Sequence, residues 1–167
     1  MKNLLEINDL KVTFPTDDGF VNAVDGVSLT VAPGETVAIV GESGSGKTVT
    51  SLSVIGLHNR KVTQLSGSIM VKDKDESLDI VSAPVDKIRS YRGRVVSMIF
   101  QDPMSSLHPY YKIGSQLAEA YLVHNPGKKE AANKKAIEML DLVGISEPQM
   151  RAREYPHQFS GGMRQRV

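Results

Sequence analysis

The chain has 167 residues, of which 40% are hydrophobic and 23% are charged, and its 20 Lys and Arg residues nearly balance its 19 Asp and Glu residues. This length allows one domain with a buried core, while a net charge of +1 gives no support for a nucleic-acid partner. The lack of cysteine excludes disulfides and cysteine-based metal or redox sites.

The beginning of the chain, MKNLLEINDLKVTF, does not have the pattern of a signal peptide, because Glu6 and Asp9 interrupt its apolar run. No stretch of the sequence approaches the roughly 20 apolar residues that a membrane-spanning helix needs. We therefore expect a cytoplasmic protein that reaches a membrane only through a partner.

The first part of the sequence predicts antiparallel strands. Residues 4–14 and 27–31 are rich in β-branched residues that partly alternate with polar ones. The segment PTDDG at 15–19 has the composition of a turn between them. The runs SIMV at 68–71 and LDIV at 78–81 flank a charged stretch and predict a hairpin.

Two further segments have the pattern of strands that are buried on both faces of a parallel sheet. These are the short, continuous apolar runs TVAIV at 36–40 and RVVSMIF at 94–100. The first leads into a glycine-rich loop and then into a helix expected to end near Leu57.

The pattern becomes helical after Pro109. Apolar residues recur at helical spacing in 113–124 and 128–143, and Asn125-Pro126-Gly127 separates the two segments. The stripe of the second helix consists of Ala132, Ala136, Leu140 and Val143, with Gly144 as its cap. We expect two parts: residues 1–109, a β region with a nucleotide-binding core, and residues 110–167, a helical subdomain.

GESGSGKT at residues 41–48 matches the phosphate-binding pattern GxxxxGK[ST] between an expected strand and an expected helix. In such a loop, glycines let backbone N–H groups face a phosphate, while Lys47 meets the β- and γ-phosphates and Thr48 reaches Mg²⁺. The alternative is a glycine-rich turn with a surface lysine, which the strand–loop–helix context disfavours. The expected nucleotide-binding residues are Gly41, Ser43, Gly44, Ser45, Gly46, Lys47 and Thr48.

Two other places have features of a phosphate site. Ser160, Gly161 and Gly162 offer a hydroxyl and two unobstructed N–H groups at the start of a short helical segment. Gln101, followed by Asp102-Pro103, ends the run 94–100, where a parallel strand would deliver it to the ligand edge of the sheet. Gln101 alone could equally be a polar strand end.

Together these residues resemble the nucleotide-binding subunit of an ABC transporter. Gly41 to Thr48 resembles the Walker A loop, Gln101 the Q-loop glutamine, and FSGGM at 159–163 the signature LSGGQ. GESGSGKT, MIFQDPMSSLHP and YPHQFSGGMRQRV are similar to the first of the two ATPase subunits of oligopeptide and dipeptide importers. The departures are Phe159 for Leu, Met163 for Gln and His108 for Asn, and Met is typical of this subgroup.

The resemblance implies an α/β, P-loop NTPase (ABC ATPase) fold with an N-terminal antiparallel β region and a helical subdomain. It implies ATP and Mg²⁺ as cofactors, with Lys47 stabilising the transferring phosphoryl group and with Thr48 and Gln101 at the metal. Ser160 to Gly162 would cap the γ-phosphate held by a second ATPase subunit, identical or homologous. Membrane permease subunits would be further partners. Phe20 is a candidate for stacking on adenine, whereas Phe14 is expected in the core.

In the family, the signature precedes a Walker B Asp, a catalytic Glu and a switch histidine. None of these can be placed in Met163–Val167, so we expect an N-terminal fragment that lacks part of the core sheet and is inactive alone. The chain's histidines all precede the signature and show no metal-ligand spacing: His58, His108, His124 and His157.

Three other functions compete with peptide import. An ABC-type chromosome or repair ATPase would carry long coiled coils between Lys47 and Ser160, and sustained heptads are missing there. A non-catalytic nucleotide-binding or assembly module stays open, as does the ATPase of a related nickel importer, because other subunits select the solute.

Overall fold

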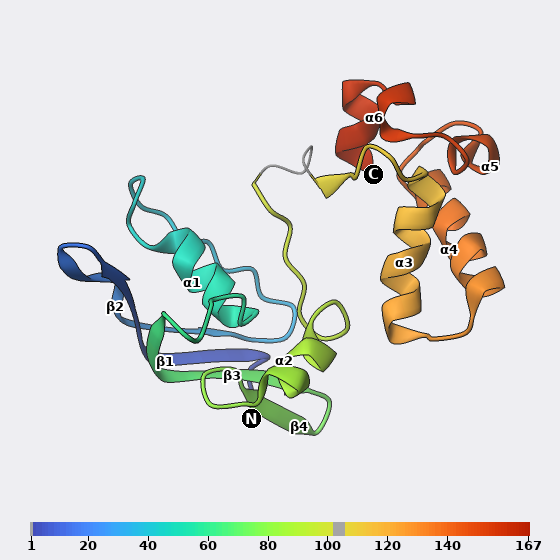
Figure 1. Ribbon diagram of the computed structural model, residues 1–167. Helices are drawn as coiled ribbons and strands as arrows, with labels where there is room; N and C mark the ends of the chain where they lie inside the picture. Colours follow the sequence, from blue (N-terminus) through green and yellow to red (C-terminus); the bar gives the residue numbers. More distant parts are fainter. Residues whose placement is uncertain (1, 102–105) are drawn as a thin grey trace. The chain divides into compact units, whose positions relative to one another are not determined.

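The structure is a computed structural model that describes residues 2–101 and 106–167 (Figure 1). The chain divides into two compact units, with the boundary in the sequence between Met98 and Ile99. This division falls earlier than the boundary at residue 109 that the sequence suggested. The unit that contains the helices after Pro109 therefore begins at Ile99.

The first unit is built on a four-stranded antiparallel sheet with the strand order β2-β1-β3-β4. The strands expected at 4–14 and 27–31 are confirmed as β1 (Leu5–Thr16) and β2 (Gly19–Val31), joined by a tight turn. β2 begins earlier than expected because the turn needs only Asp17 and Asp18. The predicted second hairpin is also confirmed, as β3 (Gln64–Asp73) and β4 (Glu76–Asp79).

The pairing of β1 with β2 shifts register at three points, of which two lie around Leu10 and one lies between Val12 and Thr13. Asp9 has a positive φ of 45°, and a Cβ on Gly67 would lie 2.3 Å from the Asp9 carbonyl oxygen, so only glycine fits there. Further along, Val12 pairs with Val24 and Thr13 with Asn22, which leaves Ala23 as an extra residue in β2. This last irregularity lies where the glycine-rich loop meets the sheet.

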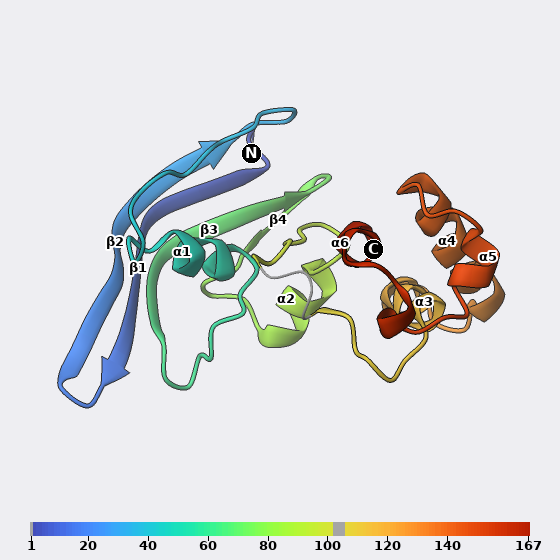
Figure 2. The same cartoon turned by 90° about the horizontal axis from the view of Figure 1, so that it is seen from above.

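Helices α1 (Lys47–Val54) and α2 (Val85–Tyr91) lie on the same face of this sheet (Figures 1 and 2). These elements share one hydrophobic core, whose largest buried side chains include Ile7, Leu10, Ile69, Ile80 and Ile88. Burying a side chain of this size contributes about 1.5–3 kcal/mol each. The apolar positions of β1 and β3 therefore contribute to the stability of the unit together with the buried side chains that follow β4.

Two arginines tie the loops of the first unit together. Arg92 donates from Nε to the Ile55 carbonyl at 2.7 Å and also donates to the Gly56 carbonyl. It thereby provides hydrogen-bond donors for two backbone carbonyls where the chain leaves α1. Arg60 donates to the Ala83 carbonyl at 2.6 Å and bonds the carbonyls of Ile80 and Val81. Half-buried carbonyls after α1 and β4 thus find charged donors, which strengthens the hydrogen bonds.

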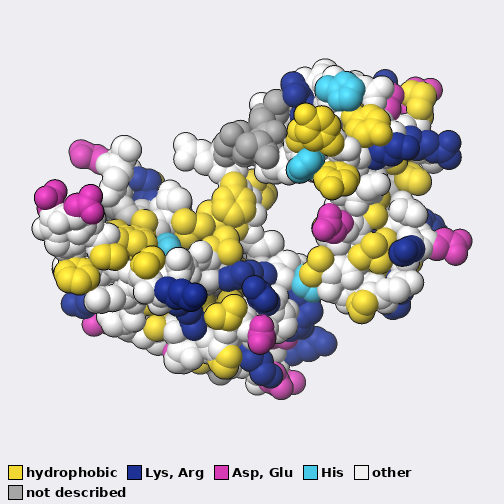
Figure 3. Space-filling view, in the orientation of Figure 1, with side chains coloured by type: hydrophobic (Ala, Val, Ile, Leu, Met, Phe, Trp, Pro, Cys, Tyr) yellow, Lys and Arg dark blue, Asp and Glu magenta, His cyan; other side chains and the backbone are white. Residues whose placement is uncertain are grey.

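The prediction of buried strands at 36–40 and 94–100 is wrong for this structure. Residues 36–40 have no regular structure, and Val40 is 88% exposed. In the second segment only Val96 forms an isolated parallel bridge, to Arg92, and Ile99 is 91% exposed. A strand buried on both faces needs neighbouring strands on both edges. Within residues 2–101 and 106–167, the sheet does not include either segment. Figure 3 shows hydrophobic side chains exposed on the first unit.

The second unit is helical, as expected. Helices α3 (Ile113–His124) and α4 (Lys129–Leu142) lie side by side, and three short helical segments follow: α5 (Pro148–Arg151), η2 (Pro156–Gln158) and α6 (Gly161–Arg166). The stripe of α4 is buried at Ala132, Ala136 and Leu140, but Val143 is exposed. Gly144 follows α4 with a φ of 72°, which confirms its capping role.

The cores of this unit are small clusters. Ile113, Leu140, Ile145 and Phe159 pack together and so connect α3 and α4 to the segment before α6. The alanines of α4 pack against Ala118 of α3, which lets the two helices approach closely. In the described parts of the chain, no helix combines the length and the apolarity that crossing a bilayer requires.

Candidate functional site: a glycine-rich loop on an antiparallel sheet

The glycine-rich loop joins the irregular segment 36–40 to the first turn of α1. Gly44 and Gly46 have φ angles of 83° and 86°. Glycine adopts these left-handed conformations without the steric cost that a Cβ brings. The two glycines turn the chain sharply, so α1 begins at Lys47 directly after the loop.

The loop contacts β2 through Gly46. A Cβ on this residue would lie 2.4 Å from the Ala23 carbonyl oxygen and 3.3 Å from a methyl of Val24. The contact falls on the extra residue of β2. The side of the loop that faces the sheet therefore has no room for a side chain, and the loop is fixed by steric contact.

Lys47 folds back over its own loop. Its ammonium group donates to the carbonyl oxygens of Gly41 at 2.8 Å and Glu42 at 2.6 Å, and to the Ser45 hydroxyl at 3.2 Å. These contacts place a positive charge at the centre of the loop. The carbonyl oxygens of the first two loop residues are thereby satisfied, and the loop holds its curved form.

The loop offers unused donors beside that charge. The backbone N–H groups of Gly44, Gly46, Lys47 and Thr48 have no hydrogen-bond partner among the described residues, whereas Ser45 N donates to Glu42 O at 3.2 Å. No acidic residue lies in the first turn of α1, so nothing offsets the positive end of the helix. Free N–H groups, a helix start and an ammonium group fit a phosphate chain.

Thr48 and Thr50 have different roles in the first turns of α1. Thr48 is exposed, and within the described chain its hydroxyl has no partner, so it is available as an oxygen ligand for Mg²⁺. Thr50 is buried, and both its N–H and its hydroxyl donate to the Gly46 carbonyl, at 2.8 and 3.0 Å. Thr50 therefore fixes the junction between loop and helix.

The two phenylalanines considered for adenine lie in different environments. Phe20 is at the start of β2, opposite Pro15, and is 67% exposed. Phe14 packs against the core, and its ring meets that of His58 edge-on at 5.6 Å. An exposed ring on the strand that seats the loop is compatible with a stacking surface. Phe20 stays a prediction.

Gln101 belongs to the second unit and is exposed. Asp102 and Pro103, which follow it, lie outside the described residues. The roles expected of Gln101 at the metal and toward the helical subdomain stay predictions.

The signature residues form the beginning of α6. Ser160 is the N-cap, and its hydroxyl oxygen accepts the Met163 N–H at 3.2 Å, so its proton can still be donated outward. Gly161 and Gly162 are exposed, and a Cβ on either would meet no atom within 4 Å. This open surface could admit a ligand held by another molecule.

Sequence reasoning identified the loop but missed its attachment. The contact of Gly46 with Ala23 and the return of Lys47 to the Gly41 and Glu42 carbonyls appear only in the folded chain. The pattern requires glycine before the lysine, at Gly46. A position restricted to glycine indicates that a side chain would not fit there. The pattern gave no indication that β2 would be the neighbour.

The fold and the loop together define a P-loop NTPase of the ABC ATPase type, with an antiparallel β region and a helical unit. Residues 24–167 match the family described as ABC transporter. The chain belongs to this family.

Curated relatives point to a subgroup. The chain is 48% identical over 169 residues to the oligopeptide transport ATP-binding protein OppD of Mycobacterium bovis, covering 100% of this chain and 27% of the relative. It is 49% identical over 170 residues to the dipeptide transport ATP-binding protein DppD of Bacillus subtilis, covering 100% of this chain and 49% of the relative. The chain thus spans half of these relatives or less.

A solved structure supports the fold. The bacterial ABC transporter cassette MJ0796, in its dimeric structure, matches with a TM-score of 0.78 at 22% identity, over 97% of this chain and 66% of the cassette. At this identity the likeness concerns the fold alone.

Proposed function

We propose that this chain provides the nucleotide-binding part of the ATPase subunit of an importer for oligopeptides or dipeptides. The observation that carries the proposal is the loop at 41–48, with free N–H groups around the Lys47 ammonium. The relatives at 48% and 49% identity, named for oligopeptide and dipeptide transport, support the choice of solute class.

Bound ATP with Mg²⁺ supplies the phosphoryl group whose transfer to water drives transport. The N–H groups of Gly44, Gly46, Lys47 and Thr48 would hold its phosphates, with Gly41, Ser43 and Ser45 completing the loop. Lys47 would leave its carbonyl partners for the β- and γ-phosphates and stabilise charge on the transferring group. The Thr48 hydroxyl, and Gln101, would lie at the metal. Phe20 would stack on the adenine.

The second unit would connect this site to partners. Ser160, Gly161 and Gly162 form an exposed helix start, which would cap the γ-phosphate held by a second ATPase subunit, identical or homologous. Gln101 would report the γ-phosphate to the helical unit, which would bind the membrane permease. The complete protein would then lie at the inner face of the cell membrane, attached through the permease.

Calorimetric titration of the chain with ATP and Mg²⁺ tests the nucleotide site. We expect saturable binding, no binding of adenosine, and competition by ADP, because the phosphates make the main contacts. Equal binding of adenosine and ATP would contradict the proposal. Uptake of a labelled dipeptide by cells that express the complete subunit, with and without Lys47→Ala, tests the transport role, and a nickel uptake assay provides the comparison with the alternative solute.

A further inference from the structure

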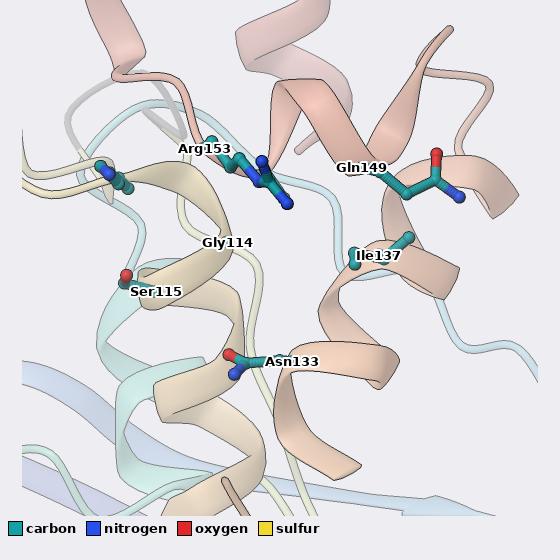
Figure 4. Close-up of a pocket in the computed structure, with 8 residues that line it drawn as sticks. Gly114, Ser115, Asn133, Ile137, Gln149 and Arg153 are labelled. Atoms are coloured by element: carbon teal, nitrogen blue, oxygen red, sulfur yellow. The ribbon is translucent and has the colours of Figure 1, made fainter. Parts of the chain in front are cut away.

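The second unit has a hollow between α3, α4 and α5, with a volume of about 360 Å³ (Figure 4). Its polar lining consists of Lys112, Ser115, Asn133, Gln149 and Arg153, and Ile137 provides an apolar wall. All of these residues belong to the unit that begins at Ile99. None of them is assigned to the nucleotide site proposed above.

The charged side chains that line this hollow are all positive. Lys112 and Arg153 are exposed cations, and among the described residues neither side chain has a hydrogen-bond or ion-pair partner. The lining includes no carboxylate. By contrast, the neighbouring Arg151 is paired with Glu154 at 2.8 Å. Two cations on adjoining segments are thus left without a counter-charge.

The fold brings these cations together through a short backbone pairing. Ile113 N donates to Glu154 O and Gly114 N donates to Ala152 O, both at 2.9 Å. A Cβ on Gly114 would lie 2.7 Å from the Ala152 carbonyl oxygen, so the glycine permits this close approach. The pairing brings the backbone next to Lys112 close to the backbone next to Arg153 at the start of α3.

The neutral side chains complete a set of donors. In Figure 4, Arg153 reaches into the space between Gly114 and Ile137, Asn133 points from α4 toward α3, and Gln149 points away from both. The Ser115 hydroxyl lies one residue after Gly114 in the first turn of α3. An arginine fork with amide and hydroxyl donors nearby is suited to an oxyanion.

The geometry points to a binding site for a small oxyanion-bearing ligand, a carboxylate or a phosphate monoester, in the hollow between α3, α4 and α5. Arg153 and Lys112 bind the charged end, Ser115 and Asn133 donate hydrogen bonds to it, and a short apolar body packs against Ile137. The volume admits a small molecule or one acidic side chain.

Amide chemical shifts of ¹⁵N-labelled chain test this site, with glutarate, inorganic phosphate and the neutral analogue glutaramide as probes. We expect saturable shifts of the Gly114 and Ser115 amides with glutarate, with phosphate or with both, and none with glutaramide. A response to only one anion identifies the ligand class. Equal response to glutaramide, or no saturable shift of the Gly114 and Ser115 amides with either anion, would overturn the proposal.

Variants then assign the charge. Arg153→Gln should weaken anion binding at least about 5-fold, and Lys112→Gln provides an independent test in the same direction. Lys128→Gln is the matched control, because Lys128 is exposed in the same unit and does not line the hollow. Weakening by Lys128→Gln as large as that by both lining variants would mean that only general charge attracts the anion, and the site would be rejected.

Discussion

Gly46 lies against the backbone of Ala23, so close that a Cβ on Gly46 would come within 2.4 Å of the Ala23 carbonyl oxygen. This contact joins the phosphate loop to the antiparallel sheet at the extra residue of β2. The position of the loop is therefore set by a steric fit and by the hydrogen bonds that Thr50 gives to the Gly46 carbonyl. Sheet, loop and helix start are coupled at one residue.

The first prediction compares Gly46→Ala with Gly44→Ala. Both glycines have positive φ, so both variants carry the backbone cost of about 1 kcal/mol. Of these two glycines, only Gly46 has other atoms within 4 Å of the position that a Cβ would take. We expect Gly46→Ala to lower the free energy of unfolding, measured in urea, by clearly more than Gly44→Ala and to abolish ATP binding. Equal losses in the two variants would show that the Ala23 contact does not fix the loop.

The second prediction concerns the charge of Lys47. Replacing it by alanine should weaken ATP binding about 10- to 150-fold, since a charge-assisted hydrogen bond contributes roughly 1.5–3 kcal/mol. Lys61→Ala is the control, because Lys61 is exposed and its side chain is not part of the loop. Calorimetry gives both dissociation constants. An unchanged value for Lys47→Ala would mean that the lysine does not contact the phosphates.

The third prediction concerns hydrolysis. In the part of the chain that the structure describes, no three His, Cys, Asp or Glu side chains gather as they would around a metal ion. Glu42, the second residue of the loop, is exposed. We expect residues 1–167 to bind ATP but to release phosphate no faster than background, because family resemblance places the catalytic Glu after the signature. Robust phosphate release by residues 1–167 would locate the base within these residues.

The fourth prediction separates the signature from the phosphate loop. In a complete subunit, Gly161→Asp adds bulk and negative charge to an open helix start where a partner's phosphate would dock. ATP binding to the monomer should persist, while ATP-driven association, followed by light scattering, should fail. Gln165→Glu adds the same charge to the same helix away from its start and should leave association intact. Loss of monomer binding in Gly161→Asp would argue against a role toward the partner.

The fifth prediction follows from exposed apolar side chains. Val40 is 88% exposed and Ile99 is 91% exposed, within segments that have the composition of buried strands. Such segments favour association of chains. We expect the apparent mass of residues 1–167 to rise with concentration, and Val40→Lys and Ile99→Lys to reduce this rise. Val62→Lys, at a residue 51% exposed outside these segments, is the control. A constant monomer mass would contradict the expectation.

Much of the local structure could be read from the sequence. β1 and the β3–β4 hairpin were predicted because alternation and turn residues are local signals, and α3 and α4 because their apolar stripes recur at helical spacing. The loop at 41–48 was predicted because its chemistry needs glycines and a lysine at fixed spacing. Each of these features depends on residues that are near each other along the chain.

Tertiary structure alone decided the rest. TVAIV at 36–40 has the composition of a buried strand, yet it lies exposed, because a strand forms only where a neighbouring strand offers hydrogen bonds. Likewise Ala23 contacts Gly46, and the backbone next to Lys112 pairs with the backbone next to Arg153, through contacts between segments distant in sequence. Composition and spacing determined which elements and which loop this chain has. Contacts across the fold determined which surfaces those elements bury and which charges they bring together.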